Sequence, residues 1–365
     1  MSKQWKIAAA NAGLRLYTRI AGNFRPAASF DPQHSFERIV IFSTTALGDL
    51  MLNTPAIRAL RERYPAAQIT LVSSHKNRPL VAGSPWFYDV IYWDHKAKDI
   101  LSVIRRLRKN RPQLAVILHS KAPYDVIAAI AAGCQYLFKD LYGNKPSGME
   151  RWLTGVSHST GGHLIQRKLD MVGQLGCRTD NPEMFIPVAF PPRETPPGQP
   201  IVGFQMGASE TLRCWPVERF VQLAQRLLAQ SATVQIALIG SAAERAIAHE
   251  FMAGLSEEQR QRVVSHVGNT TLLQLLAVIA DMRLLITGDT GPLHLAIALK
   301  TPTISLFVTA NPRYSGPYQH RELHQIIAFS AETQPMNPAQ LAQPLSIIDA
   351  EQVLERALTV LSDEA

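Results

Sequence analysis

Short apolar runs alternate with helical patterns along most of the chain. The first such unit has an apolar run at 39–42, a helical pattern at about 49–64 and a second apolar run at 69–72. Further apolar runs at 90–93, 114–118 and 136–138 alternate with helical stretches near 97–109 and 121–132. Because strands that alternate with helices form a parallel sheet covered on both faces, the pattern predicts a doubly wound α/β domain over residues 37–186.

A proline-rich stretch separates this domain from a second one. Residues 187–200 contain six prolines and interrupt every periodicity, which is typical of a linker. The alternation of apolar runs and helical patterns resumes over 201–348, with apolar runs at 201–205, 234–239, 263–266, 284–287 and 303–307. An amphipathic pattern in 349–365 predicts a closing helix. The sequence therefore predicts two Rossmann-like domains facing one another across a cleft, with ligands outside the carboxyl ends of the strands.

The first 36 residues precede this pattern and form a basic amphipathic segment. Its apolar residues recur at roughly helical spacing, at Trp5, Ala9, Ala12, Leu16 and Ile20, and its basic residues are Lys3, Lys6, Arg15, Arg19 and Arg25. Two interpretations remain open. The segment could lie on an anionic membrane, or it could be a helix packed on the body of the protein with its charges in water.

Composition limits the class of protein. With 365 residues, 46% hydrophobic and 18% charged, the chain has enough apolar material for two ordinary cores and is not disordered. No apolar run approaches the length of a membrane-spanning helix, and no signal peptide precedes the first domain, so we expect a cytoplasmic protein. Its three cysteines are far apart and lack a CxxC pair, which argues against a disulfide framework and a zinc site.

The basic charge points to an anionic partner. A net charge of +8 and a pI near 9.5 suit nucleic acid, a phospholipid surface or a phosphorylated substrate. The sequence has no helix-turn-helix spacing, no zinc finger and no stripe of alternating basic and aromatic residues. Nucleic acid is therefore the least supported of these partners.

The loop after the first strand of the first domain contains an acidic residue at a predicted helix start. It reads Ser43-Thr44-Thr45-Ala46-Leu47-Gly48-Asp49-Leu50, and its single glycine excludes the dinucleotide-binding fingerprint. Asp49 could cap the helix, a role that aspartate often fills. Thr44 or Thr45 could cap it equally well, which would leave the carboxylate of Asp49 available as a general base.

The stronger signal is the loop Thr287-Gly288-Asp289-Thr290-Gly291-Pro292-Leu293-His294, which follows an apolar run in the second domain. Proline is favoured in the first helical turn, so Pro292 marks a helix start. Two glycines let the backbone approach a diphosphate, and the threonine hydroxyl and the helix dipole favour an anion. A plain strand-to-helix turn would explain Asp289 and Pro292 but not the second glycine and the threonines.

A third loop, 205–216, follows the first strand of the second domain. Ser209 and Thr211 offer hydroxyls, and Arg213 offers a fork of donors to a diphosphate leaving group. A single loop arginine is more often a surface charge. The sequence has no clear Asp-x-Asp pair, so a metal-bridged diphosphate is not expected, and Arg213 with the helix end would stabilise the negative charge.

Together these residues resemble the ADP-heptose:lipopolysaccharide heptosyltransferases, glycosyltransferase family nine. The resemblance runs from about Arg38 to the C-terminus and rests on three spaced motifs in order. They are Ala46-Leu47-Gly48-Asp49 with Thr54-Pro55-Ala56-Ile57-Arg58-Ala59-Leu60; Gly207-Ala208-Ser209 with Arg213-Cys214-Trp215-Pro216; and Gly288-Asp289-Thr290-Gly291-Pro292-Leu293-His294 with Pro312-Arg313 and Gly316-Pro317-Tyr318. The resemblance implies the two-domain GT-B fold and inverting, metal-independent transfer without a cofactor.

The resemblance also implies roles for single residues. Asp49 would deprotonate the acceptor hydroxyl, and Arg213, where the family often has lysine, would contact the donor phosphate. The donor itself would be held by Ser209, Thr211, Glu244, Asp289, Thr290, Gly291 and His294, with Glu244 at the nucleoside. Because arginine adds length and a planar fork, the change from lysine could alter the donor.

The acceptor implied by the resemblance is an anionic lipopolysaccharide core, which would account for the basic pI and for contact with the inner membrane. Thr45, Gly48, His119 and Lys121 lie where the first domain would meet it, although His119 and Lys121 could equally be structural or solvated. Two other functions stay open. A nucleotide-sugar epimerase can share this architecture, and a non-catalytic binding protein could retain the fold.

Overall fold

The computed structural model describes residues 3–21, 24–25, 30–94, 97–141, 148–157, 162–191, 198–330 and 336–362. The chain divides into two compact units, Met1–Val188 and Ala189–Ala365, and each is described by itself. The division falls inside the proline-rich stretch 187–200. Among the described residues no helix is long and apolar enough to cross a membrane.

Unit 1 is built on a six-stranded parallel sheet. Its strands lie in the order β3-β2-β1-β4-β5-β6. They are β1 (Arg38–Ser43), β2 (Gln68–Ser73), β3 (Asp89–Tyr92), β4 (Leu114–His119), β5 (Tyr136–Asp140) and β6 (Gly155–Ser157). The central strands are apolar throughout because helices cover both of their faces. This order changes direction between β1 and β4, and such a switch point is where doubly wound sheets bind ligands.

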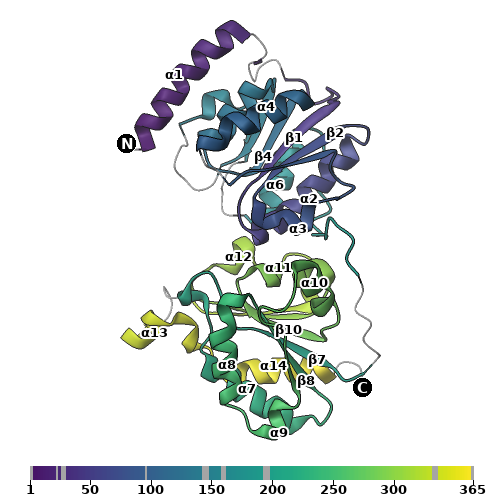
Figure 1. Ribbon diagram of the computed structural model, residues 1–365, viewed down its shortest axis with the longest axis vertical. Helices are drawn as coiled ribbons and strands as arrows, with labels where there is room; N and C mark the ends of the chain where they lie inside the picture. Colours follow the sequence, from purple (N-terminus) through teal and green to yellow (C-terminus); the bar gives the residue numbers. More distant parts are fainter. Residues whose placement is uncertain are drawn as a thin grey trace. The chain divides into compact units, whose positions relative to one another are not determined.

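The helices of unit 1 pack on both faces of this sheet (Figure 1). They are α1 (Lys3–Ala21), α2 (Leu47–Arg63), α3 (Arg78–Val81), α4 (Ile100–Asn110), α5 (Tyr124–Ala132) and α6 (Leu164–Gly173). Helix α2 packs against α6, and α4 packs against α5. The apolar runs predicted as strands 1 to 5 are confirmed, whereas β6 and α6 were not predicted.

Unit 2 repeats the same topology. Its six-stranded parallel sheet has the order β12-β11-β10-β7-β8-β9, so the switch point lies between β7 and β10. The strands are β7 (Ile201–Gln205), β8 (Gln235–Ile239), β9 (Val263–Ser265), β10 (Leu284–Gly288), β11 (Thr303–Phe307) and β12 (His324–Ala328). The helices are α7 (Val217–Gln230), α8 (Arg245–Ala253), α9 (Glu257–Arg260), α10 (Leu272–Ala280), α11 (Gly291–Leu299), α12 (Pro312–Ser315), α13 (Pro338–Ala342) and α14 (Ala350–Ser362).

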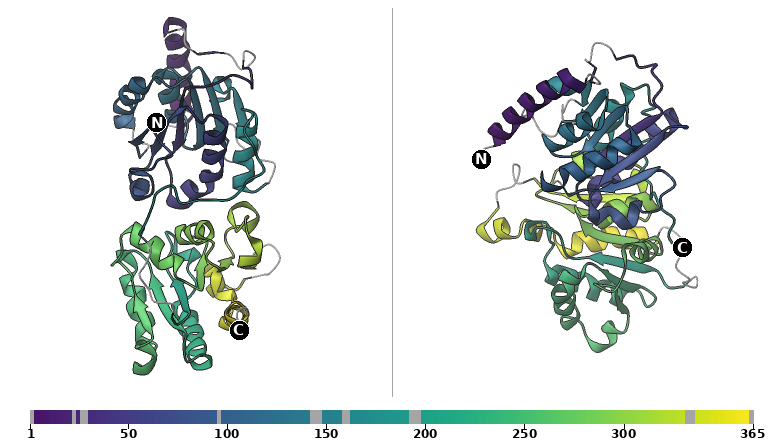
Figure 2. Two further views of the ribbon diagram at one scale, coloured as in Figure 1. Left: turned by 90° about the vertical axis from the view of Figure 1, so that its right-hand side faces the viewer. Right: turned by 45° about the horizontal axis from the view of Figure 1, so that its top comes forward.

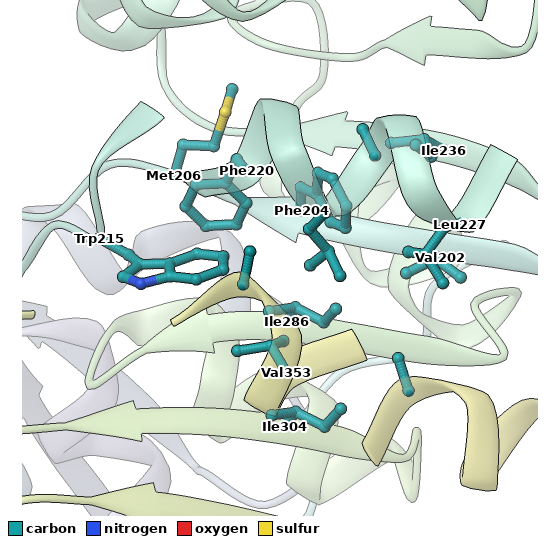
Figure 3. Packing of buried hydrophobic residues seen from close by; sticks show 14 of the residues in the cluster. Val202, Phe204, Met206, Trp215, Phe220, Leu227, Ile236, Ile286, Ile304 and Val353 are labelled. Atoms are coloured by element: carbon teal, nitrogen blue, oxygen red, sulfur yellow. The ribbon is translucent and has the colours of Figure 1, made fainter. Parts of the chain in front are cut away.

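The core of unit 2 fixes the third candidate loop at one end. Trp215, two residues before the start of α7, is buried against Phe220 (Figure 3), and its indole N–H donates to the carbonyl of Ile348 at 2.9 Å. The closing helix α14 contributes Val353 to the same core. Because these contacts hold residue 215, the loop that precedes it is anchored at the mouth of the sheet.

The N-terminal helix α1 packs on unit 1, but through a face that the sequence did not suggest. Leu14 is buried, Ile7 and Tyr17 are packed against the unit 1 core, and the amide of Asn11 donates to the carbonyl of Gly148 at 2.9 Å. The helix runs along the outside of the unit in all three views (Figures 1 and 2). Residues 3–21 of this segment are therefore a helix packed on unit 1, and its outer face is a separate question.

Cysteine pairing is absent, as the spacing predicts. Cys134, Cys177 and Cys214 are all free, and the first two are buried. Burial raises the pKa of the Cys177 thiol to about 12, so this side chain is a neutral part of the core.

Candidate active site

Two residues meet at the switch point of unit 1. Asp49 lies in the first turn of α2, and His119 is the last residue of β4, the strand next to β1. His119 Nδ1 lies 3.2 Å from Asp49 Oδ1. The sequence named both residues, 70 positions apart, and the parallel pairing of β1 with β4 brings them into contact.

Burial decides the charge of this histidine. The largest effect on His119 is loss of solvent, which lowers its pKa to about 4; nearby Lys168 and Lys139 act in the same direction, and Asp49 opposes them. The imidazole is therefore neutral near pH 7 and has one N–H. Its Nδ1 is the ring nitrogen that faces the Asp49 carboxylate, at 3.2 Å from Oδ1.

The capping of α2 differs from the expectation. Neither Thr44 nor Thr45 caps the helix, because Ala46 is the N-cap residue and Asp49 Oδ2 accepts from its backbone N–H at 3.2 Å. Thr44 instead directs its hydroxyl to Ser120, at 3.1 Å. Asp49 thus has both a structural contact through one oxygen and a second oxygen beside His119.

The other acceptor residues named from the sequence do not all lie beside Asp49 and His119. Thr45 and Gly48 belong to the loop and the first turn beside Asp49, and the carbonyl of Thr45 accepts from the amide of Asn77 at 3.1 Å. Lys121 is exposed two residues beyond His119. The structure therefore brings Thr45, Gly48 and His119 together with Asp49, and places Lys121 at the surface of the same strand end.

A buried charged network lies behind this pair, and the sequence reasoning missed it. Asp140, the last residue of β5, accepts from Arg167 at 2.6 Å and from the hydroxyl of Ser157. Lys139 pairs with Asp125 and donates to the carbonyl of residue 120 at 2.9 Å. A Lys-Asp pair directly after an apolar strand was the available signal, because strand ends form the ligand edge of the sheet.

Lys168 of α6 is the least compensated member of this network. Its side chain is fully buried, and its ammonium lies 3.9 Å from Asp140 Oδ2 without a hydrogen bond to any described residue. Burial lowers the pKa of Lys168, while the nearby carboxylates of Asp140 and Asp49 oppose this shift. The buried lysine therefore costs desolvation free energy that these carboxylates, neither of them hydrogen-bonded to it, offset only in part.

Because Lys168 is poorly compensated, substitutions of Lys168 and of Asp140 should have opposite effects on the free energy of unfolding. Lys168→Met should leave the free energy of unfolding unchanged or raise it by about 1–4 kcal/mol, because Asp140 keeps Arg167 and the buried ammonium is removed. Asp140→Asn should lower it by about 3–5 kcal/mol, because buried cations lose their carboxylate. Urea unfolding of both variants measures the difference, and destabilisation by Lys168→Met as large as that by Asp140→Asn would contradict it.

In unit 2 four of the seven predicted donor residues line one cavity at the switch point. A cavity of about 390 Å³ is lined by Ser209, Glu244, Thr290 and Gly291, with further residues of the loops after β7, β8 and β10. Helix α11 begins at Gly291, so its first backbone N–H groups lie at this edge, and no side chain caps them. Such a helix start favours an anion.

Glu244 is held in place by backbone and glycine contacts. Its carboxylate accepts from the backbone N–H of Ser241, and Gln205 Nε2 lies 3.5 Å away. A side chain at Gly207 or Gly240 would collide with this carboxylate, so glycine at both positions leaves the space that the Glu244 side chain occupies. Burial raises the pKa of Glu244 from its usual value. The group is thus a fixed acceptor on the cavity wall.

Three further predicted residues form a chain of charges beside this cavity. Arg213 NH1 lies 3.7 Å from Asp289 Oδ2, and Asp289 Oδ1 lies 3.9 Å from Nε2 of the buried His294. Gly288 allows this approach, because a Cβ there would lie 2.9 Å from the carbonyl oxygen of Arg213. The arginine that looked like a possible surface charge is therefore half-buried against an acidic residue of the strongest motif.

Thr211 lies apart from the residues above. It lines a neighbouring cavity of about 690 Å³ that shares Glu244 and Ser209 with the first one.

The hydroxyl of Thr290 contacts that of Thr287 at 2.9 Å, so it is already engaged within its loop. Thr270 and Thr271, which the sequence reasoning did not select, also line the smaller cavity.

Comparison with known proteins shows which family this chain resembles. A model of glycosyltransferase family 9 (heptosyltransferase) matches residues 178–345, which contain both cavities. A curated relative, lipopolysaccharide heptosyltransferase 2 of Salmonella typhimurium, is 24% identical over 354 residues and covers 90% of this chain and 99% of its own length. The chain is similar to glycosyltransferase family 9 over residues 178–345, and to a curated heptosyltransferase over 90% of its length.

The family's solved structures share the fold. A family 9 glycosyltransferase of Veillonella parvula aligns with a TM-score of 0.74 and 21% identity, covering 90% of this chain and 97% of its own. The E. coli ADP-heptose lps heptosyltransferase II aligns with a TM-score of 0.72 and 22% identity, covering 90% and 100%. The predicted GT-B fold and the assignment as a glycosyltransferase are confirmed; the epimerase and the binding protein are set aside.

Proposed function

We propose that this glycosyltransferase moves a heptose from ADP-heptose to the inner core of lipopolysaccharide, with inversion at the transferred carbon and without a metal ion. The observation that carries the proposal is the cavity at the switch point of unit 2, where Ser209, Glu244, Thr290 and Gly291 converge. Relatives across almost the whole chain are named as lipopolysaccharide heptosyltransferases, which supports the same substrates.

In this proposal unit 2 binds the donor. The uncapped start of α11 and the Thr290-Gly291 backbone take the diphosphate, while Glu244 accepts hydrogen bonds from the nucleoside. Arg213 stabilises the charge that develops on the leaving diphosphate, because its guanidinium is held beside the same loop by Asp289. Arg213 and the helix dipole thereby supply the positive charge that a divalent cation provides in other transferases.

Unit 1 supplies the acceptor side of the reaction. Asp49 accepts the proton of the acceptor hydroxyl as that oxygen attacks the anomeric carbon, and the bond from this carbon to the diphosphate breaks on the opposite face. The backbone N–H of Ala46 holds the Asp49 carboxylate in place, with neutral His119 beside its other oxygen. The basic protein surface and the acceptor's anionic core suit a location at the cytoplasmic face of the inner membrane.

A donor screen by titration calorimetry tests this assignment. ADP-heptose, UDP-sugars and GDP-sugars are titrated into the full chain, and we expect ADP-heptose to bind most tightly. Glu244→Ala should weaken ADP-heptose binding by about tenfold, because a half-buried carboxylate on the cavity wall is lost. The exposed Glu257 offers a matched control in Glu257→Ala. Preference for a uridine or guanosine nucleotide would overturn the donor assignment.

A further inference from the structure

The packing of α1 leaves an apolar stripe on its outer face. Trp5, Leu16 and Ile20 are 57%, 63% and 78% exposed, respectively, and all three belong to this one helix. Trp5 and Leu16 are separated by eleven residues, which is about three helical turns, and Leu16 and Ile20 by four, so the three lie on one face. The α1 stripe, defined as Trp5, Leu16 and Ile20 with the exposed Ala9 and Ala12 between them, is about 22 Å long.

The opposite face of the helix already meets the protein. Ile7 and Tyr17 pack on the core of unit 1, Leu14 is buried, and the phenol of Tyr17 donates to the carbonyl of Ala131 at 3.3 Å. Asn11 adds two contacts, to the Gly148 carbonyl and from the indole N–H of residue 152. The helix is therefore apolar on two opposite faces, and among the described residues it is the inner face that packs against the core of unit 1.

Positive charge borders the stripe on both sides. Arg15 and Arg19 follow one edge at a spacing of four residues, and Lys6 lies beside Trp5 on the other edge. All three are exposed, and none forms an ion pair with a residue that the structure describes. The helix sequence contains no aspartate or glutamate. The outer face thus combines exposed apolar side chains with uncompensated cations.

We propose that the α1 stripe binds the surface of an anionic lipid bilayer. An interfacial helix of this kind lies in the plane of the membrane, with its apolar side chains at the boundary of the acyl chains and its lysines and arginines at the head groups. Tryptophan is enriched at this boundary, and anionic head groups attract the flanking cations. Helix α1 is thereby assigned the membrane contact, while the strand ends of unit 1 keep the acceptor site.

A second copy of the chain is the competing occupant, and charge disfavours it. Two copies packed through their stripes would bring Lys6, Arg15 and Arg19 of each helix near the cations of the other without an acidic partner on either helix. Protein interfaces also tend to exclude charged residues from their centres. An anionic bilayer provides the missing negative charge along the whole length of the helix.

Vesicle flotation of the full chain tests the proposal. The purified protein is mixed with vesicles of phosphatidylcholine alone, or of phosphatidylcholine with phosphatidylglycerol, and we expect binding only to the anionic vesicles. A triple variant Trp5→Ser, Leu16→Ser and Ile20→Ser should bind at least about tenfold more weakly. A control variant replaces Tyr88 and Leu341, which are exposed to a similar degree elsewhere, with serine and should bind like the wild type.

The charge part of the proposal has its own variant. Substitution of Lys6, Arg15 and Arg19 by glutamine should weaken binding by about tenfold and remove most of its salt dependence. Unchanged vesicle binding by the stripe variant, or no binding by the wild type, would overturn the proposal. Sedimentation of both proteins without lipid is the second readout, and conversion of a wild-type dimer to a monomer by the stripe variant would assign the face to a second copy instead.

The vesicle-binding test does not depend on the proposed sugar transfer. The inference rests on the proposed function only in that the acceptor belongs to a membrane. With a delipidated, water-soluble acceptor, the stripe variant should transfer sugar at the wild-type rate. Absence of transfer by the wild type would count against the proposed function. The vesicle result would still decide whether the α1 stripe binds an anionic bilayer.

Discussion

Asp49→Asn is expected to reduce the turnover number by about 100- to 10,000-fold, the range that a general base contributes. Asparagine has the same shape, and its amide oxygen can still accept from the backbone N–H of Ala46, which holds the start of α2. What is lost is the oxygen that lies 3.2 Å from His119 and can accept the acceptor's proton. Steady-state release of ADP in the presence of acceptor measures the effect.

The affinity for the donor separates this effect from unfolding. The proposed donor site is built from unit 2 alone, so Asp49→Asn should leave the calorimetric dissociation constant for ADP-heptose within about twofold of wild type. Asp180→Asn is the matched control, because Asp180 is an exposed carboxylate of the same unit paired with Arg178. Turnover by Asp49→Asn close to that of this control would remove Asp49 from the chemistry.

Arg213→Ala is expected to lower turnover by about 100- to 1,000-fold, as removal of a donor to developing negative charge does in other enzymes. The guanidinium lies 3.7 Å from Asp289 Oδ2, and the other basic group beside that carboxylate among the described residues is His294, at 3.9 Å. The substitution therefore also removes the nearest cation from Asp289. Arg213→Lys should recover part of the activity, because the charge returns without the planar fork.

A second arginine of unit 2 provides the control. Arg219 lies on α7 and pairs with Asp349 at 3.0 Å, away from the cavity lining, so Arg219→Ala should keep near wild-type turnover. Addition of EDTA should change neither protein's rate, because the proposal assigns the charge stabilisation to Arg213 and the start of α11. Strong inhibition by EDTA with recovery on adding Mg²⁺ would contradict this part of the account.

The sequence predicted the sheets better than it predicted their edges. Strands such as β1 and β4 are buried on both faces and therefore appear as continuous apolar runs. The short β6 has only three residues, and β12 is half-exposed at its end of the sheet, so neither produces such a run. Helix α6 was missed although its face is buried, because charged residues interrupt its apolar pattern.

The candidate site also contains residues that could be predicted from the sequence and residues that could not. The loops could be found because parallel strands bring their carboxyl ends to one edge, which places His119 beside Asp49 without any local signal between them. Lys168 could not be found in this way, because a lysine in a helix is normally solvated and only the packing of α6 buries it. The outward direction of the α1 stripe likewise depends on which of two apolar faces the core accepts.

Transfer with the full chain, ADP-heptose and a heptose-deficient lipopolysaccharide core tests the central claim most directly. Free ADP and the mass of the acceptor are followed in the same reaction. The account predicts that ADP appears only when acceptor is present and that each ADP released corresponds to one heptose added. Release of ADP without acceptor, or an acceptor of unchanged mass after ADP has formed, would contradict it.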